Sequence, residues 1–158
     1  LIEAILVLTI TGLLASVVIV NLRNQKTLDR SSDEVISWLR LAQSQATSGK
    51  NESSTGYGFF FRPVALKYQD YIFYTDTNKN KKYDGSDTEK SLKVYSPTEF
   101  ETCSYKAGQK CDIFFSLPDG AVYTNGALAI ENPTITLRSS AEGSKIITIN
   151  IVSGLISL

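Results

Sequence analysis

The N-terminal stretch constrains this chain more than any other part of it. Residues 4–20 contain no charged side chain and are mostly aliphatic, whereas nearly all the charge lies beyond Asn21. A helix of about 20 residues is about 30 Å long, the thickness of the hydrocarbon core of a bilayer. We therefore expect residues 1–26 to form a hydrophobic helix that inserts into a membrane.

Glu3 is the one acidic residue at the start of this apolar run. An ionised carboxylate surrounded by lipid is costly unless it is paired, so such a residue is a functional candidate. The alternative is an interfacial position at the helix start, where the helix dipole favours negative charge. That alternative gives Glu3 no role once the helix leaves a bilayer.

Residues 27–48 are predicted to continue as an amphipathic helix. Apolar residues recur there at spacings of three and four, which places them on one helix face. They are Val35, Trp38, Leu39, Ala42 and Ala46. The sequence 31–34, Ser-Ser-Asp-Glu, matches a capping box, so the helix could instead restart at Ser31. Gly49 is expected to end it.

The rest of the chain, residues 56–158, shows alternating strand patterns separated by turn signals such as Asn125-Gly126. The predicted strands are Tyr57–Arg62, Lys67–Thr75, Ser91–Ser96, Asp112–Leu117, Ala121–Thr124, Thr134–Ser139, Lys145–Val152 and Leu155–Leu158. We expect an α+β fold in which a long N-terminal helix, membrane-spanning in its first half and amphipathic in its second, packs on an antiparallel β-sheet head. The head would comprise residues 27–158 as one globular domain.

Two cysteines, Cys103 and Cys111, lie close together in a loop-like stretch. Outside the cytoplasm we expect them to form a disulfide that closes a short loop. The alternative is a pair of free thiols in a reducing compartment.

The composition argues against an enzyme and against a general nucleic-acid binder. The chain has no histidine, which excludes most hydrolase triads and histidine-containing zinc sites. Its 16 basic and 16 acidic residues give a net charge of zero, whereas nucleic-acid-binding domains are usually basic. No motif indicates a catalytic site.

The first 15 residues, LIEAILVLTITGLLA, resemble the start of a mature type IV pilin or type II secretion pseudopilin. This resemblance implies processing by a prepilin peptidase, methylation of the new N-terminal residue, and a role for Glu3 in assembly. Glu3 would meet the N-terminal amine of a neighbouring subunit. Two departures are the lack of the proline that many pilins carry near the end of the apolar run, and the basic residues Arg23 and Lys26 just after it.

Three further segments resemble the FimT/GspH-type minor pilins, which pack two antiparallel sheets against the helix. The segments are LRLAQSQATSGK at 39–50, YIFYTDTNKNKKYD at 71–84 and TINIVSGLISL at 148–158. The resemblance implies a structural subunit of an extracellular type IV pilus-like filament, with other copies of itself and other pilins as partners. It also implies an inner-membrane stage before assembly and a position on the cell surface afterwards.

Three alternatives to a pilus subunit stay open at this point. The first is a type II secretion pseudopilin, and the second is a DNA-binding minor pilin for natural transformation. The third is a single-span anchored ectodomain that does not polymerise.

Residues 76–87 place oxygen-bearing side chains in the order of an EF-hand calcium loop. The candidate Ca²⁺ ligands are Asp76, Asn78, Asn80, the Lys82 carbonyl, Asp84 and Asp87. Lys81 stands where a glycine is usual, and Asp87 replaces the usual bidentate glutamate. The alternative is a hairpin tip held by Asx turns, in which these side chains bond to their own backbone.

Lys79, Lys81 and Lys82 in the same loop are candidate DNA contacts. On a chain with no net charge, a few surface lysines more often serve solvation than nucleic-acid recognition. We expect these three to be solvated rather than to form a DNA site.

Overall fold

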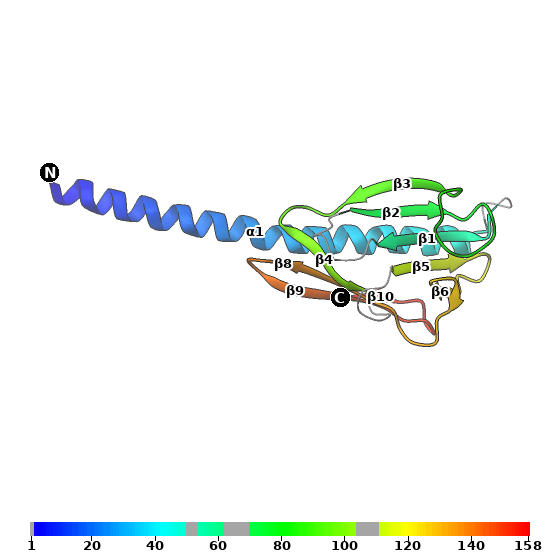
Figure 1. Ribbon diagram of the computed structural model, residues 1–158. Helices are drawn as coiled ribbons and strands as arrows, with labels where there is room; N and C mark the ends of the chain where they lie inside the picture. The colour runs from blue at the N-terminus through cyan, green and yellow to red at the C-terminus, as the bar shows by residue number, and fades with distance from the viewer. Residues whose placement is uncertain (1, 50–53, 62–69, 104–110) are drawn as a thin grey trace.

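The computed structural model describes residues 2–49, 54–61, 70–103 and 111–158. One continuous helix, α1, covers Ile2–Thr47, and its N-terminal half projects from a β-rich head (Figure 1). Gly49 follows it with a positive φ of 62°, the left-handed conformation that commonly ends helices.

The helix does not restart at Ser31. Ser31 and Ser32 are both buried, and the Ser32 hydroxyl donates to the Leu28 carbonyl at 2.8 Å, four residues back in the same helix. The Ser31 hydroxyl accepts a bond from the Tyr95 backbone N–H at 3.1 Å. These serines therefore attach an intact helix to the head rather than cap a new one.

Within the residues that the structure describes, ten strands form two antiparallel sheets. Six of them make the first sheet in the order β3-β2-β1-β5-β6-β7, and the other four make the second in the order β10-β9-β8-β4. The strands are β1 Gly56–Phe61, β2 Asp70–Thr75, β3 Thr88–Lys93, β4 Thr98–Cys103, β5 Cys111–Ser116, β6 Val122–Thr124, β7 Ala127–Leu128, β8 Thr134–Ser139, β9 Gly143–Ile149 and β10 Ile156–Ser157. The predicted strand Lys67–Thr75 begins outside the described residues, and β4 and β7 were not predicted.

The main core lies between the C-terminal half of α1 and the two sheets. Val35, Leu39, Ala42 and Ala46 are fully buried, which agrees with their helical spacing. They share one apolar cluster with aromatic residues of the first sheet and isoleucines of the second. The closest neighbours of α1 in the first sheet are β1 and β5.

The predicted fold class needs correction in two respects. In the parts of the chain described here, no helix is long and apolar enough to cross a membrane. The prediction of a membrane-spanning first half is therefore wrong, and the predicted inner-membrane stage loses its support. The second correction concerns the head: the fold class predicted from the strand pattern did not divide the antiparallel strands, whereas they form two separate sheets, the number that the resemblance to minor pilins implied.

Candidate functional site

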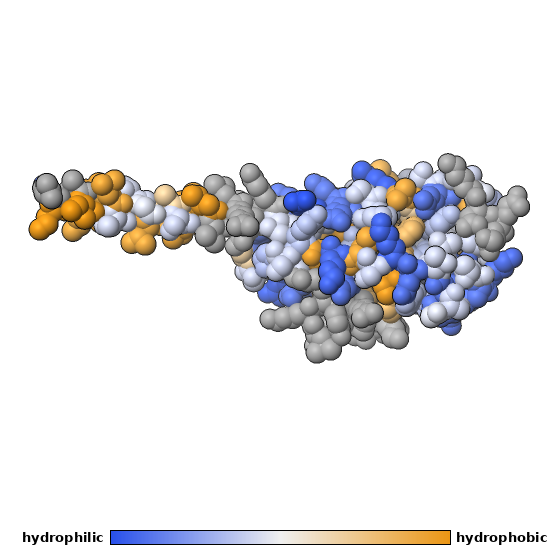
Figure 2. All heavy atoms as spheres, turned by 90° about the horizontal axis from the view of Figure 1, so that it is seen from above, coloured by the Kyte–Doolittle hydropathy of each residue, from blue (hydrophilic) through white to orange (hydrophobic). Residues whose placement is uncertain are grey.

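The projecting half of α1 is the most unusual surface of the molecule. Eleven large apolar side chains between Ile2 and Ile19 are 48–83% exposed. Figure 2 shows these hydrophobic residues gathered along the projecting helix, whereas the face of the head in view is mainly hydrophilic. A helix that is apolar on all sides is normally buried. This segment therefore needs cover from another molecule.

The polar side chains of this segment are already satisfied within the helix. Thr9 donates to the Leu6 carbonyl at 2.8 Å, Thr11 to the Val7 carbonyl at 2.8 Å, and Ser16 to the Leu13 carbonyl at 2.7 Å. Burying a hydroxyl is costly mainly when it has no partner. These three hydroxyls therefore do not oppose burial against an apolar surface.

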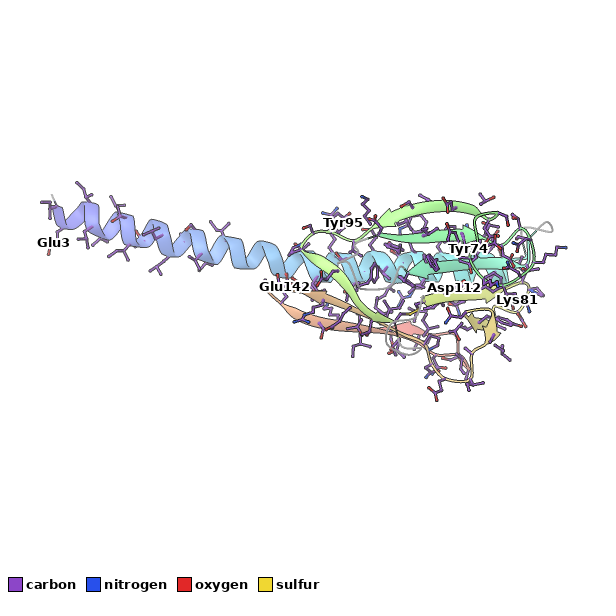
Figure 3. The ribbon with its side chains drawn as sticks, in the orientation of Figure 1. Glu3, Tyr74, Lys81, Tyr95, Asp112 and Glu142 are labelled. Carbon is purple, nitrogen blue, oxygen red and sulfur yellow. A yellow bond between two sulfur atoms is a disulfide. The ribbon has the colours of Figure 1, made fainter. Side chains whose placement is uncertain are left out.

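Glu3 lies in the first turn of α1, exposed at its free end (Figure 3). The positive end of the helix dipole favours a carboxylate there. The structure brings Glu3 near none of the other predicted site residues, which all belong to the head. Its assembly role stays a prediction.

The helix enters the head through a set of polar and aromatic contacts. Asp29 forms an ion pair with Lys145 of β9 at 2.5 Å, and the Arg30 guanidinium lies 4.2 Å from the ring centroid of Tyr95. Together with the bond from the Tyr95 N–H to Ser31, these contacts hold α1 against β9 of the second sheet and against the segment between β3 and β4. The direction in which the apolar half projects is therefore set by the head.

Asp76 organises the connection between β2 and β3, residues 76–87, which we call the tip loop. Its side chain is fully buried and accepts bonds from the backbone N–H groups of Lys79 at 2.8 Å, Asn80 at 3.2 Å and Lys81 at 3.0 Å. The Thr55 hydroxyl donates to the same carboxylate. Lys79 and Lys81 have positive φ values of 66° and 60°, a strained conformation for residues other than glycine. The Asp76 carboxylate offsets this strain.

The remaining predicted calcium ligands of the tip loop bond mainly to one another. Asn78 Oδ1 accepts from the Asn80 N–H at 3.2 Å, and Asn80 Oδ1 from the Lys82 N–H at 2.9 Å. Both side-chain amides donate to Asp84 Oδ2 at 2.5 Å. Bonds from Ser86, with those from the two amides, lower the pKa of Asp84 to about 2.

Asp87 closes the far side of the loop by accepting from the backbone N–H groups of Thr77 at 3.2 Å and Asp84 at 3.0 Å. No group of three acidic, histidine or cysteine side chains that could hold a metal occurs among the described residues. These contacts are those of the Asx-turn alternative, and the residues as arranged do not fit a metal site.

We therefore expect Ca²⁺ to leave the thermal unfolding midpoint of the chain unchanged. A site of millimolar affinity would instead stabilise the fold by about 1.4 kcal/mol at a tenfold excess of Ca²⁺ over its dissociation constant. The measurement is differential scanning fluorimetry in 10 mM CaCl₂ and in EDTA, with MgCl₂ as the control salt. A rise in the midpoint with Ca²⁺ but not with Mg²⁺ would restore the calcium hypothesis.

A buried acid that the sequence analysis did not single out, Asp112 of β5, lies beneath the tip loop. Its carboxylate accepts a bond from the Tyr74 hydroxyl at 2.6 Å and one from the Tyr83 backbone N–H at 2.5 Å. Burial raises the pKa of Asp112 to about 6, and the nearby carboxylates of Asp87 and Asp76 add to the rise. Figure 3 shows Tyr74 and Asp112 at the end of the head opposite the projecting helix.

The tip loop covers a small apolar cluster separate from the main core, made of Phe60, Ile72, Tyr74 and Phe114. Tyr83 of the loop packs on Phe60, with ring centroids 4.6 Å apart. Lys81 places its ammonium 4.1 Å from the ring centroid of Tyr123 and donates to the Tyr123 hydroxyl at 2.9 Å. Of the three candidate DNA-contacting lysines, Lys81 therefore has an internal role, whereas Lys79 and Lys82 are exposed.

Cys103 and Cys111 form a disulfide, as predicted. The structure adds what the bond connects: Cys103 ends β4 of the second sheet, and Cys111 begins β5 of the first. The crosslink therefore ties the two sheets together.

Comparison of this chain with protein-family models, with characterised proteins and with solved structures finds no match.

Proposed function

We propose that this chain is a structural subunit of a type IV pilus-like filament, held together by its N-terminal helix. The observation that carries the proposal is the projecting, apolar half of α1, whose own head leaves it uncovered (Figures 1 and 2). Burial of apolar surface stabilises a complex by about 25 cal/mol per Å². Packing these helices side by side in a polymer core removes that surface from water.

The arrangement of the rest of the chain is consistent with a subunit of this kind. The contacts of Asp29, Arg30 and Ser31 with Lys145 and Tyr95 hold the head to the helix in one orientation, which a regular polymer requires of every copy. In such a polymer the heads lie outside the core of packed helices and form the outer surface of the filament. The resemblance of residues 1–15 to mature pilins supports the same proposal.

In the proposed filament, Glu3 pairs with the N-terminal amine of a neighbouring copy. A carboxylate and an ammonium that are each costly alone in an apolar core become favourable as a pair, which selects one axial register. We expect Glu3→Ala to reduce filament yield by at least about tenfold, equivalent to about 1.4 kcal/mol per contact. The measurement is electron microscopy and quantification of filaments sheared from cells.

The control for this experiment is Glu99→Ala, which removes a carboxylate from β4 of the head and should leave filament yield unchanged. Equal yields from Glu3→Ala and the wild type would contradict the role of Glu3. If wild-type filaments contain only traces of the chain, it is a minor or pseudopilin component rather than the main subunit.

A further inference from the structure

Buried polar groups without a partner gather at the end of the head where α1 enters it. Among the described residues, five buried side-chain N or O atoms have no hydrogen-bond partner. Three of them are the hydroxyls of Tyr71 on β2, Thr98 on β4 and Ser139 on β8, residues that are 0%, 0% and 1% exposed. A fourth, Oε1 of Glu142, lies in the turn between β8 and β9, which Figure 3 shows beside the entering helix. We call Tyr71, Thr98 and Ser139 the hydroxyl cluster.

The register of the second sheet sets Thr98 and Ser139 directly opposite each other. They are Cα partners in the antiparallel ladder of β4 and β8. Opposed residues in such a ladder project on the same face, with their Cβ atoms about 4.5–5.5 Å apart. That face is the inner one, because Phe100 and Leu137, two residues away on each strand, belong to the main core. The two hydroxyls therefore share one buried space.

Tyr71 reaches the same region from the first sheet. Its ring lies edge-on to that of Phe100, with centroids 5.5 Å apart. Burial raises the pKa of the Tyr71 phenol well above its usual value, and the nearby Glu34 and Tyr95 add to the rise. The Thr98 N–H donates to the Tyr95 carbonyl at 2.8 Å, so Tyr95 and Thr98 belong to one turn. The phenol of Tyr71 thus lies between the two sheets, near the turn that begins β4.

A second hydroxyl pair in the same ladder bonds without any third partner. Thr102 and Thr136 are also Cα partners, and their Oγ1 atoms form a direct hydrogen bond at 2.9 Å. Thr98 and Ser139 make no such bond, although they are buried. A buried hydroxyl without a partner is costly, because it has given up its hydrogen bonds to water. Three of them in one region require a partner that can both donate and accept.

We propose that the hydroxyl cluster binds an internal water molecule between the two sheets. Buried waters in proteins make about three hydrogen bonds to polar groups that otherwise have no partner. The cluster supplies three hydroxyls, each of which can donate or accept. The water therefore adds a polar link between two sheets that the disulfide already joins. The site belongs to the head and is independent of the proposed filament function.

Thr98→Val tests whether the site is filled, because valine keeps the shape of threonine and removes the hydroxyl. We expect the equilibrium constant for unfolding of the full-length chain to rise about tenfold, since the water loses one of its partners. In a dry site the same substitution removes a hydroxyl that has no partner, and the constant falls instead. The measurement is urea unfolding, and valine retains the backbone N–H that donates to Tyr95. Ser139→Ala is the second variant and should change the constant in the same direction.

Oxygen-17 magnetic relaxation dispersion counts long-lived internal waters and separates a bound water from a direct bond between hydroxyls. The double variant Thr98→Val/Ser139→Ala should hold about one such water fewer than the wild type. The matched control is Thr102→Val, which removes the exposed hydroxyl pair of the same ladder and should leave the count unchanged. Equal counts in the double variant and the wild type would overturn the proposal. A lower unfolding constant would then indicate a dry site, and a higher one a direct bond between Thr98 and Ser139.

Discussion

Asp76→Ala is expected to lower the free energy of unfolding by about 3 kcal/mol or more. The substitution leaves three backbone N–H groups and the Thr55 hydroxyl without their acceptor. Bonds to a charged group contribute about 1.5–3 kcal/mol each, and the loss is only partly offset by water because Asp76 is fully buried. Lys79 and Lys81 would also lose what holds them at positive φ. The measurement is urea unfolding followed by circular dichroism.

The control for this prediction is Asp33→Ala, which removes an exposed carboxylate from α1 and should change stability by no more than about 0.5 kcal/mol. A second variant, Lys79→Gly, should stabilise the chain by up to about 1 kcal/mol, because glycine adopts positive φ without strain. A change below 1 kcal/mol for Asp76→Ala would show that the tip loop rearranges and that Asp76 does not organise it.

The stability of the chain is expected to fall by about 2 kcal/mol between pH 4 and pH 7.5, mainly because of Asp112. Its folded pKa of about 6 lies above the usual value of about 3.9 that it regains on unfolding. The folded state therefore binds the proton more tightly, and its extra stability is fully present below pH 4. That stability is lost as the pH rises through 6. Urea unfolding at several pH values measures this slope.

Asp112→Asn should flatten the slope between pH 5 and 7.5, because the amide does not ionise. Burial also raises the pKa of Asp87 and Glu142, so these two carboxyls act in the same direction. Glu142→Gln is the matched control, since it removes one of these smaller contributions at the other end of the head (Figure 3). A slope in Asp112→Asn as steep as in the wild type would assign the effect to the other carboxyls.

The sequence was informative wherever the signal is local. Helical spacing identified the buried residues Val35, Leu39, Ala42 and Ala46, because a helix repeats its faces every 3.6 residues. Alternation located most strands, and the Asn125-Gly126 turn joins β6 to β7 with both residues at positive φ. The close spacing of Cys103 and Cys111 in an otherwise cysteine-free chain predicted their disulfide.

The sequence was less informative where segments distant along the chain meet. The strand β4 pairs with β8 across a bulge between Phe100 and Thr102, and its TEFETC sequence has no regular apolar alternation. Asp112 was missed although an acid within the run Cys-Asp-Ile-Phe-Phe is a visible anomaly. Its partner Tyr74 is 38 residues away, and only the pairing of β1 with both β2 and β5 brings the two together.

The sequence by itself determined an apolar N-terminal segment, an amphipathic helix after it, a β-rich remainder and a disulfide. These follow from residue properties and short-range periodicity, which do not depend on how the segments meet. Only the tertiary structure decided which strands form each of the two sheets, that the disulfide joins the sheets, and that the tip loop closes over Asp76 and Asp112. The reason is that these features depend on contacts between segments far apart in the chain, and a local pattern carries no information about which segments become neighbours.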